Sequence, residues 1–72
     1  MGYEETLRAM VELVSSNDNI DDIMYNAYDR MTEKLKDSDL HQLADIYFSV
    51  TGRLDKANKL YTELSHFNEG LM

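Results

Sequence analysis

The sequence predicts an all-α fold, a small three-helix bundle with a long C-terminal helix. Apolar residues recur at three- and four-residue spacing in three successive stretches, which is the periodicity of helices that bury one face. Short runs of Ser, Asn and Asp separate these stretches, and the chain has no proline. With 72 residues, the chain has room for one helical domain, residues 1–72, with one modest core.

The first predicted helix begins near Tyr3 and ends in the run Ser15–Asn19. Its apolar side is spaced by four, three, one and three residues: Tyr3, Leu7, Met10, Val11 and Val14. Glu4 and Glu5 suit its first turn, where the helix dipole favours negative charge. The residues of Ser15–Asn19 favour turns and caps over helix interiors, so the helix should end there.

The second predicted helix is capped by Asn19 or Asp18 and continues to about Lys36. Its apolar stripe consists of Ile20, Ile23, Met24, Ala27, Met31 and Leu35, with Tyr28 at the border. Lysines near the end carry the sign of charge that the helix C-terminus favours. Asp37–Asp39 is the next break, and Asp37 or Ser38 can cap a third helix.

The third stretch, Leu40–Leu71, keeps one heptad register throughout. Position a holds Leu40, Tyr47, Leu54 and Tyr61, position d holds Leu43, Val50, Ala57, Leu64 and Leu71, and position g holds Ile46, Leu60 and Phe67. Asn68 is the only polar residue in the a/d seam. The pattern indicates one long helix that faces the core.

Gly52 leaves two alternatives open for this stretch. In the heptad register it falls at a solvent-facing position, where a long packed helix can absorb a glycine at a cost of about 1 kcal/mol. Alternatively, Thr51–Arg53 forms a turn and two antiparallel helices follow. The unbroken register and the absence of proline favour the single helix.

Charge is concentrated in the first half of the chain. The net charge is −7, and residues 1–39 hold ten of the 14 acidic residues. This balance argues against direct binding to nucleic acid, which needs clustered Lys and Arg, and is compatible with a basic protein partner. The chain has no cysteine, no apolar run long enough for a membrane span and no signal-peptide pattern, so we expect a cytoplasmic protein.

No catalytic, cofactor-binding or metal-binding residues are predicted, and we expect no enzyme activity. His41 and His66 fall on polar faces, and catalysis would need one of them in a pocket beside a carboxylate. The run Asn17–Asp22 is rich in oxygen ligands but lacks the glycine and the spacing of an EF-hand loop. A helix start with acids matched to the dipole explains it.

These features predict a non-enzymatic regulator or inhibitor whose acidic helical surface binds a basic, nucleic-acid-binding protein. Three apolar residues lie off the predicted core stripes: Leu13, Tyr25 and Phe48. The last two would form an aromatic anchor if the fold brought them together. The candidate partner-binding residues are Glu4, Glu5, Glu12, Asp18, Asp21, Asp22, Tyr25, Asp29, Glu33 and Phe48. The alternative function is a homodimeric adaptor that pairs through the Leu40–Leu71 stripe.

Several short segments resemble the Hha/YmoA family of small nucleoid modulators. These are Ile20-Asp21, Ser38-Asp39, Tyr47-Phe48-Ser49, Arg53-Leu54 and Asn58-Lys59-Leu60-Tyr61. The resemblance implies short helices before a long one, and an accessory that docks on an H-NS-type nucleoid protein. The chain differs in its longer linker before Ser38, its shorter segment between Tyr47 and Asn58, and Thr51-Gly52 in place of Asp-His. It also lacks the family's Trp-containing C-terminal segment, so no binding residue is transferred.

A second resemblance covers about residues 40–66. Gly52-Arg53-Leu54-Asp55-Lys56-Ala57, followed by Leu60-Tyr61, is similar to the hinge and second helix of a TPR- or PPR-type hairpin. A single hairpin of this kind cannot form a repeat stack that buries its own faces.

Overall fold

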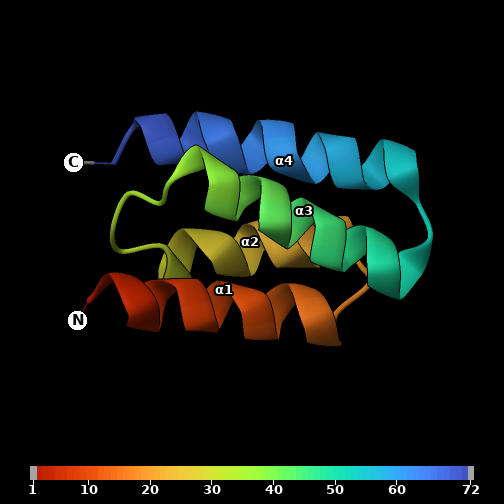
Figure 1. Ribbon diagram of the computed structural model, residues 1–72, viewed down its shortest axis with the longest axis horizontal. Coiled ribbons are helices and arrows are strands. Elements are labelled where there is room, and N and C mark those ends of the chain that lie inside the picture. The colour runs from red at the N-terminus through yellow and green to blue at the C-terminus, as the bar shows by residue number, and fades with distance from the viewer. Residues whose placement is uncertain (1, 72) are drawn as a thin grey trace.

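Four helices pack into one bundle (Figure 1) in the computed structural model, which describes residues 2–71. They are α1 (Tyr3–Ser16), α2 (Ile20–Arg30), α3 (Asp37–Thr51) and α4 (Leu54–Glu69). The all-α prediction is confirmed. The prediction of three helices with a long third one is wrong, because the Leu40–Leu71 stretch is divided into α3 and α4.

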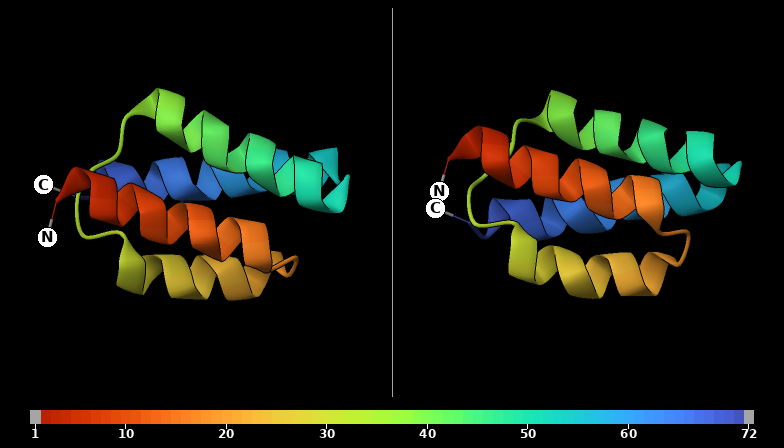
Figure 2. Two further views of the ribbon diagram at one scale, coloured as in Figure 1. Left: turned by 60° about the horizontal axis from the view of Figure 1, so that its bottom comes forward. Right: turned by 90° about the horizontal axis from the view of Figure 1, so that it is seen from below.

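The order of helices around the bundle differs from their order in the chain. Among residues 2–71, α1 packs against α2 and α3, and α4 packs against the same two helices, whereas α2 and α3 lie diagonally across the bundle. The segment Met31–Lys36 therefore crosses one end of the bundle diagonally to connect them (Figure 2). Consecutive helices run in opposite directions, so α2 and α4 are parallel neighbours (Figures 1 and 2).

The ends of the first predicted helix and the start of the second are confirmed. Glu4 and Glu5 lie in the first turn of α1, which ends at Ser16. The Asn19 side chain accepts a hydrogen bond from the backbone N–H of Asp22 at 3.0 Å, so Asn19 rather than Asp18 caps α2.

The second helix is shorter than its apolar pattern suggests. It ends at Arg30, and the prediction that it continues to Lys36 is wrong. Met31 and Leu35 are still buried, at 2% and 3% exposure, but they belong to the diagonal crossover. The reason is a tertiary partner: the backbone N–H and C=O of Leu35 bond to the side-chain amide of Asn68, each at 2.8 Å, in place of helical partners.

The start of α3 also differs from its prediction. The N-cap position is occupied by Lys36 and has no side-chain cap, so neither Asp37 nor Ser38 caps the helix. Both residues lie inside its first turn, and the Asp37 carboxylate instead accepts a hydrogen bond from Tyr61 of α4.

A tight turn at Gly52 separates α3 from α4. Gly52 adopts the left-handed conformation with φ of 70°, and its N–H donates to the C=O of Phe48 at 2.7 Å, which closes α3. Val50 and Leu54, predicted to be core residues by the heptad register, are 50% and 59% exposed beside this turn. The alternative with a turn at Thr51–Arg53 is therefore the correct one.

Replacing Gly52 by alanine should destabilise the fold by about 1 kcal/mol, because an L-residue is strained at this φ. No atom lies within 4 Å of the added Cβ, so strain is the whole effect. In a continuous helix the same change would stabilise by about 1 kcal/mol, so the sign of the change in unfolding free energy decides between the two architectures. Urea denaturation measures it, and Gly70→Ala, at a negative φ, is the matched control.

The core is formed by all four helices and the crossover. Its members are Met10, Leu13, Val14, Ile20, Ile23, Ala27, Met31, Leu35, Leu40, Leu43, Tyr47, Ala57, Leu60 and Leu64. Leu13, predicted to lie off the core stripe, is only 7% exposed. The reason is that α1 contacts both α2 and α3, so a wider face is covered, and Thr6 is buried on it as well.

Candidate protein-binding surface

The outer face of α2 gathers carboxylates around one exposed aromatic side chain. Asp21, Asp22 and Asp29 are exposed and lie three or four residues from Tyr25, so they share its side of α2, and Asp18 is exposed in the loop just before the Asn19 cap. Tyr25 itself is 72% exposed, the highest value among the large hydrophobic residues of the described chain. We call this group of five residues the α2 face.

Local hydrogen bonds order the acidic start of this face. The Asn17 side chain donates to the Asp22 carboxylate at 2.5 Å and accepts from the backbone N–H of Asn19 at 2.9 Å. The hydroxyl of Tyr47, on α3, donates to the backbone C=O of Asp18 at 3.0 Å. The loop Asn17–Asn19, which precedes α2, is thus held by the side-chain amide of Asn17 and by the hydroxyl of the core residue Tyr47.

The remaining predicted acids lie on other elements. Glu4, Glu5 and Glu12 are exposed on α1, the antiparallel neighbour of α2. Glu33 lies in the crossover and is only partly exposed, with a buried Oε2 that has no hydrogen-bond partner among the described residues. The ten predicted residues are therefore spread over α1, the loop before α2, α2 itself, the crossover and α3.

The aromatic anchor of Tyr25 and Phe48 does not form. Phe48 is 42% exposed but lies on α3, which is diagonal to α2 in the bundle. A different aromatic pair forms beside α2: Tyr28, three residues after Tyr25 and 50% exposed, packs against Phe67 of α4 with ring centroids 4.7 Å apart. The three-residue spacing of Tyr25 and Tyr28 places both on one side of α2, but nothing in the sequence pairs Tyr28 with Phe67.

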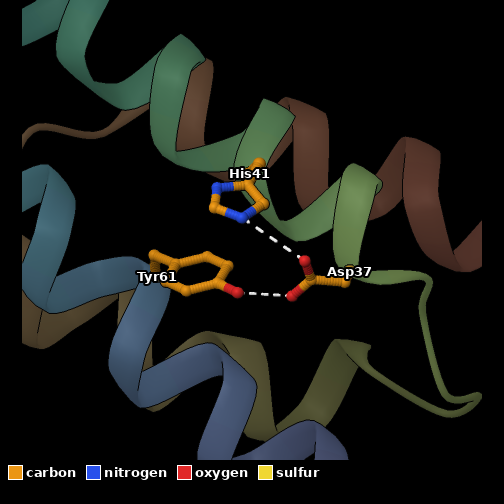
Figure 3. A network of polar contacts seen from close by, with 3 residues as sticks. All are labelled: Asp37, His41 and Tyr61. Atoms are coloured by element: carbon orange, nitrogen blue, oxygen red, sulfur yellow. Dashed lines mark hydrogen bonds and ion pairs between the residues drawn. The ribbon is translucent and has the colours of Figure 1, made fainter.

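His41 has a carboxylate beside it, on an open surface (Figure 3). Its Nε2 lies 3.3 Å from the Asp37 carboxylate, and its ring stacks on Tyr61 with centroids 4.2 Å apart. The side chains of His41 and Asp37 are 61% and 67% exposed, and the described residues enclose no pocket. Asp37 thus joins α3 to α4 by accepting a hydrogen bond from the Tyr61 hydroxyl. The other histidine, His66, is also exposed.

The described residues contain no group of three or more potential metal ligands from His, Cys, Asp or Glu. Within the same part of the chain, no helix has the length and apolar character needed to cross a membrane.

Two tyrosine hydroxyls donate to carboxylates, and their pKa values are raised. For Tyr3, burial raises the pKa first, and the hydrogen bond to Asp39 adds to it, against an opposing bond from the Lys36 N–H. For Tyr61, the hydrogen bond to Asp37 is the largest cause of the raised pKa, followed by desolvation.

These shifts predict a loss of stability at alkaline pH. Because the folded pKa of both tyrosines lies above the ordinary value of 10.0, their contribution is complete below pH 10.0 and is lost as pH rises through the folded pKa. The unfolding free energy should fall above pH 10.0, and less steeply in the double variant Tyr3→Phe/Tyr61→Phe. Urea denaturation between pH 8 and 11 tests this, with the exposed Tyr25→Phe as control. An equal slope in all three proteins would contradict the assignment.

In comparisons with known proteins, no family model matches the chain, and neither a curated protein nor a solved structure does.

Proposed function

We propose that this chain is a non-enzymatic regulator or inhibitor that binds a basic, nucleic-acid-binding protein through the α2 face. The observation that supports it best is the arrangement of four exposed carboxylates around Tyr25. Of the residues in α2 and its preceding loop, only Arg30 carries a positive charge. The face therefore offers a row of negative charges, as a nucleic-acid backbone does.

Charge and apolar area have separate roles in this proposal. Opposite potentials speed the encounter and set the orientation, while most binding free energy at protein interfaces comes from a few central aromatic or arginine contacts. Tyr25 lies among the carboxylates and Tyr28 lies one turn away, so an apolar contact at the centre and ionic contacts at the rim are both available.

The nucleoid-modulator role implied by the Hha/YmoA resemblance is one form of this function, with the regulated protein bound to DNA. An inhibitor that occupies the partner's cationic groove is another. In both forms the partner has a basic surface, and in both the α2 carboxylates are required.

Reversing three charges of the α2 face should weaken partner binding about tenfold or more at low salt and flatten its salt dependence. The variant is Asp18→Lys/Asp21→Lys/Asp29→Lys, which leaves Asp22 and its bond to Asn17 intact. The partner is first captured from nuclease-treated lysate with the unchanged chain and identified, and its dissociation constant is then measured over a range of salt.

The matched control is Asp45→Lys/Asp55→Lys/Glu69→Lys, which reverses three exposed acids on α3 and α4. Both variants change the net charge of −7 by the same six units, so only the location of the charges differs. Equal loss in the two variants would remove the α2 face from the proposal. Unchanged affinity in both, with a loss in Tyr25→Ala, would leave apolar contact as the basis of binding.

A further inference from the structure

The α2 face continues onto α4 across a seam marked by the Tyr28–Phe67 contact. The two rings fix which residues of these parallel helices lie at the same level. Three and seven residues before Tyr28 on the same side of α2 are Tyr25 and Asp21. Four, eight and eleven residues before Phe67 on the same side of α4 are Glu63, Lys59 and Lys56.

The two sides of this seam differ in charge at the same end of the bundle. Asp18, Asp21 and Asp22 lie just before and at the start of α2, whereas Lys56 and Lys59 lie with Asp55 in the first two turns of α4, and Glu63 follows one turn later. Both helices start at the end of the bundle that holds the α1–α2 loop and the Gly52 turn (Figure 1). The carboxylates and the ammonium groups are therefore level, and the aromatic pair lies further along the same seam.

These charges are not paired within the chain. The one ion pair within 4.0 Å among the described residues is His41–Asp37, on the α3–α4 side. Asp21 and Lys59 are exposed and Lys56 is partly exposed, so their ionic contacts are open to another molecule.

We infer that the α2–α4 seam is a self-association surface whose occupant is a second copy of this chain, related by a two-fold axis parallel to α2 and α4. Such an axis places α2 of one protomer against α4 of its partner and keeps their ends level, because the two helices run in the same direction. The Asp18–Asp22 segment then meets the lysines of the second copy twice, and the Tyr28–Phe67 pairs meet near the axis. The contact closes as a dimer.

This dimer concerns the same α2 face as the proposed function but needs no partner protein to form. It covers Tyr25 and Asp21, so a basic partner has to compete with the second copy for them. In the dimer the α2 face is occupied by the second copy until a partner of higher affinity displaces it. Because a seam of two short helices buries little area, we expect a weak, concentration-dependent dimer with a dissociation constant on the order of 10–100 µM.

Charge-swapped variants test the dimer more clearly than a change of salt concentration does. Salt screens the attraction at the seam and also the repulsion between two chains of net charge −7, with opposing effects. The test is sedimentation velocity of the full chain over a wide concentration range, with circular dichroism to confirm that each variant is folded.

The unchanged chain should dimerise, and Lys56→Glu/Lys59→Glu and Asp18→Lys/Asp21→Lys should each raise the dissociation constant about tenfold or more. Mixing the two variants should restore a dimer, because positions 18, 21, 56 and 59 are then all lysine in one variant and all acidic in the other. The control Arg8→Glu/Lys34→Glu, with the same net charge as the α4 variant and exposed sites elsewhere, should dimerise like the unchanged chain.

A monomer at several hundred micromolar would overturn the inference, as would an undiminished dimer in the α4 variant or no heterodimer in the mixture. If a swapped variant does not fold, Lys56→Gln/Lys59→Gln replaces it, with a smaller rise expected. Partner binding by the monomeric α4 variant, which keeps every α2 carboxylate, tests the proposed function separately.

Discussion

Replacing Tyr47 by alanine should destabilise the protein by about 3–5 kcal/mol, the usual cost of removing a buried aromatic side chain. Tyr47 is 0% exposed and lies on α3 among core residues from the other elements. A domain of this size has a total unfolding free energy of only about 4–11 kcal/mol. We therefore expect the variant to be largely unfolded at 37 °C, as measured by the loss of helical circular dichroism and a lowered urea midpoint.

The conservative change Tyr47→Phe separates the ring from the hydroxyl. It removes only the hydrogen bond to the Asp18 C=O, so the expected loss is about 1 kcal/mol. Because that bond holds the loop before α2, amide hydrogen exchange should also rise in Asn17–Asn19. The exposed Tyr25→Phe should change neither quantity. A loss as large as that of Tyr47→Ala would mean that the hydroxyl, and not the packed ring, dominates.

The starts of α1 and α2 could be predicted because their causes are local. The Asn19 side chain caps α2 by accepting a hydrogen bond from an N–H only three residues away. The acidic residues of the first turns interact favourably with the helix dipole. The exposure of the α2 carboxylates follows from the same local pattern, since they fall opposite the apolar stripe. The exposure of most residues of the α2 face could therefore be predicted from local sequence.

The end of α2 depended on a contact between distant residues. The i+4 spacing of Ala27, Met31 and Leu35 fits a helix, yet the last two are buried from an extended crossover because Asn68 supplies the hydrogen bonds of Leu35. Nothing within the α2 stretch signals this, because Asn68 lies 33 residues away from Leu35.

The unbroken heptad register favours a single helix over the Gly52 turn, although the turn is what the structure contains. Both helices of an antiparallel pair turn an apolar stripe toward the same core. Only Gly52 and Arg53 separate α3 from α4, and by coincidence the apolar residues of α4 fall in the same heptad positions as those of α3. Val50 and Leu54, on either side of the turn, are exposed, so the heptad register does not predict burial there. The stripe of the homodimer alternative is therefore divided, and Leu40, Leu43, Tyr47, Ala57, Leu60 and Leu64 are buried within the chain.

The α2–α4 seam is beyond sequence reasoning for a similar reason. Tyr28 and Phe67 are 39 positions apart, and they meet because the crossover moves α3 to the far side of α1 and leaves α2 beside α4. The crossover is therefore the element that brings the charged and aromatic groups of the seam together.

Asn68→Leu should accordingly destabilise the fold by about 2–4 kcal/mol, although it replaces the one polar residue of an apolar stripe with an apolar one of similar volume. Asn68 is 6% exposed, and its amide satisfies both the N–H and the C=O of Leu35. Each buried backbone group left without a partner costs about 1–3 kcal/mol, which exceeds the gain from burying more apolar surface.

The control for this change is Asn58→Ala, on an exposed position of the same helix, which should alter the unfolding free energy by less than about 0.5 kcal/mol. Urea denaturation gives both values, and hydrogen exchange at the Leu35 amide reports the crossover directly. If Asn68→Leu proved neutral or stabilising, the crossover would be held by the burial of Met31 and Leu35 and by its hydrogen bonds to Tyr3 and Thr6 of α1. A large loss with fast exchange at Leu35 would instead show that one side-chain amide fixes the diagonal connection, and with it the neighbours of the α2 face.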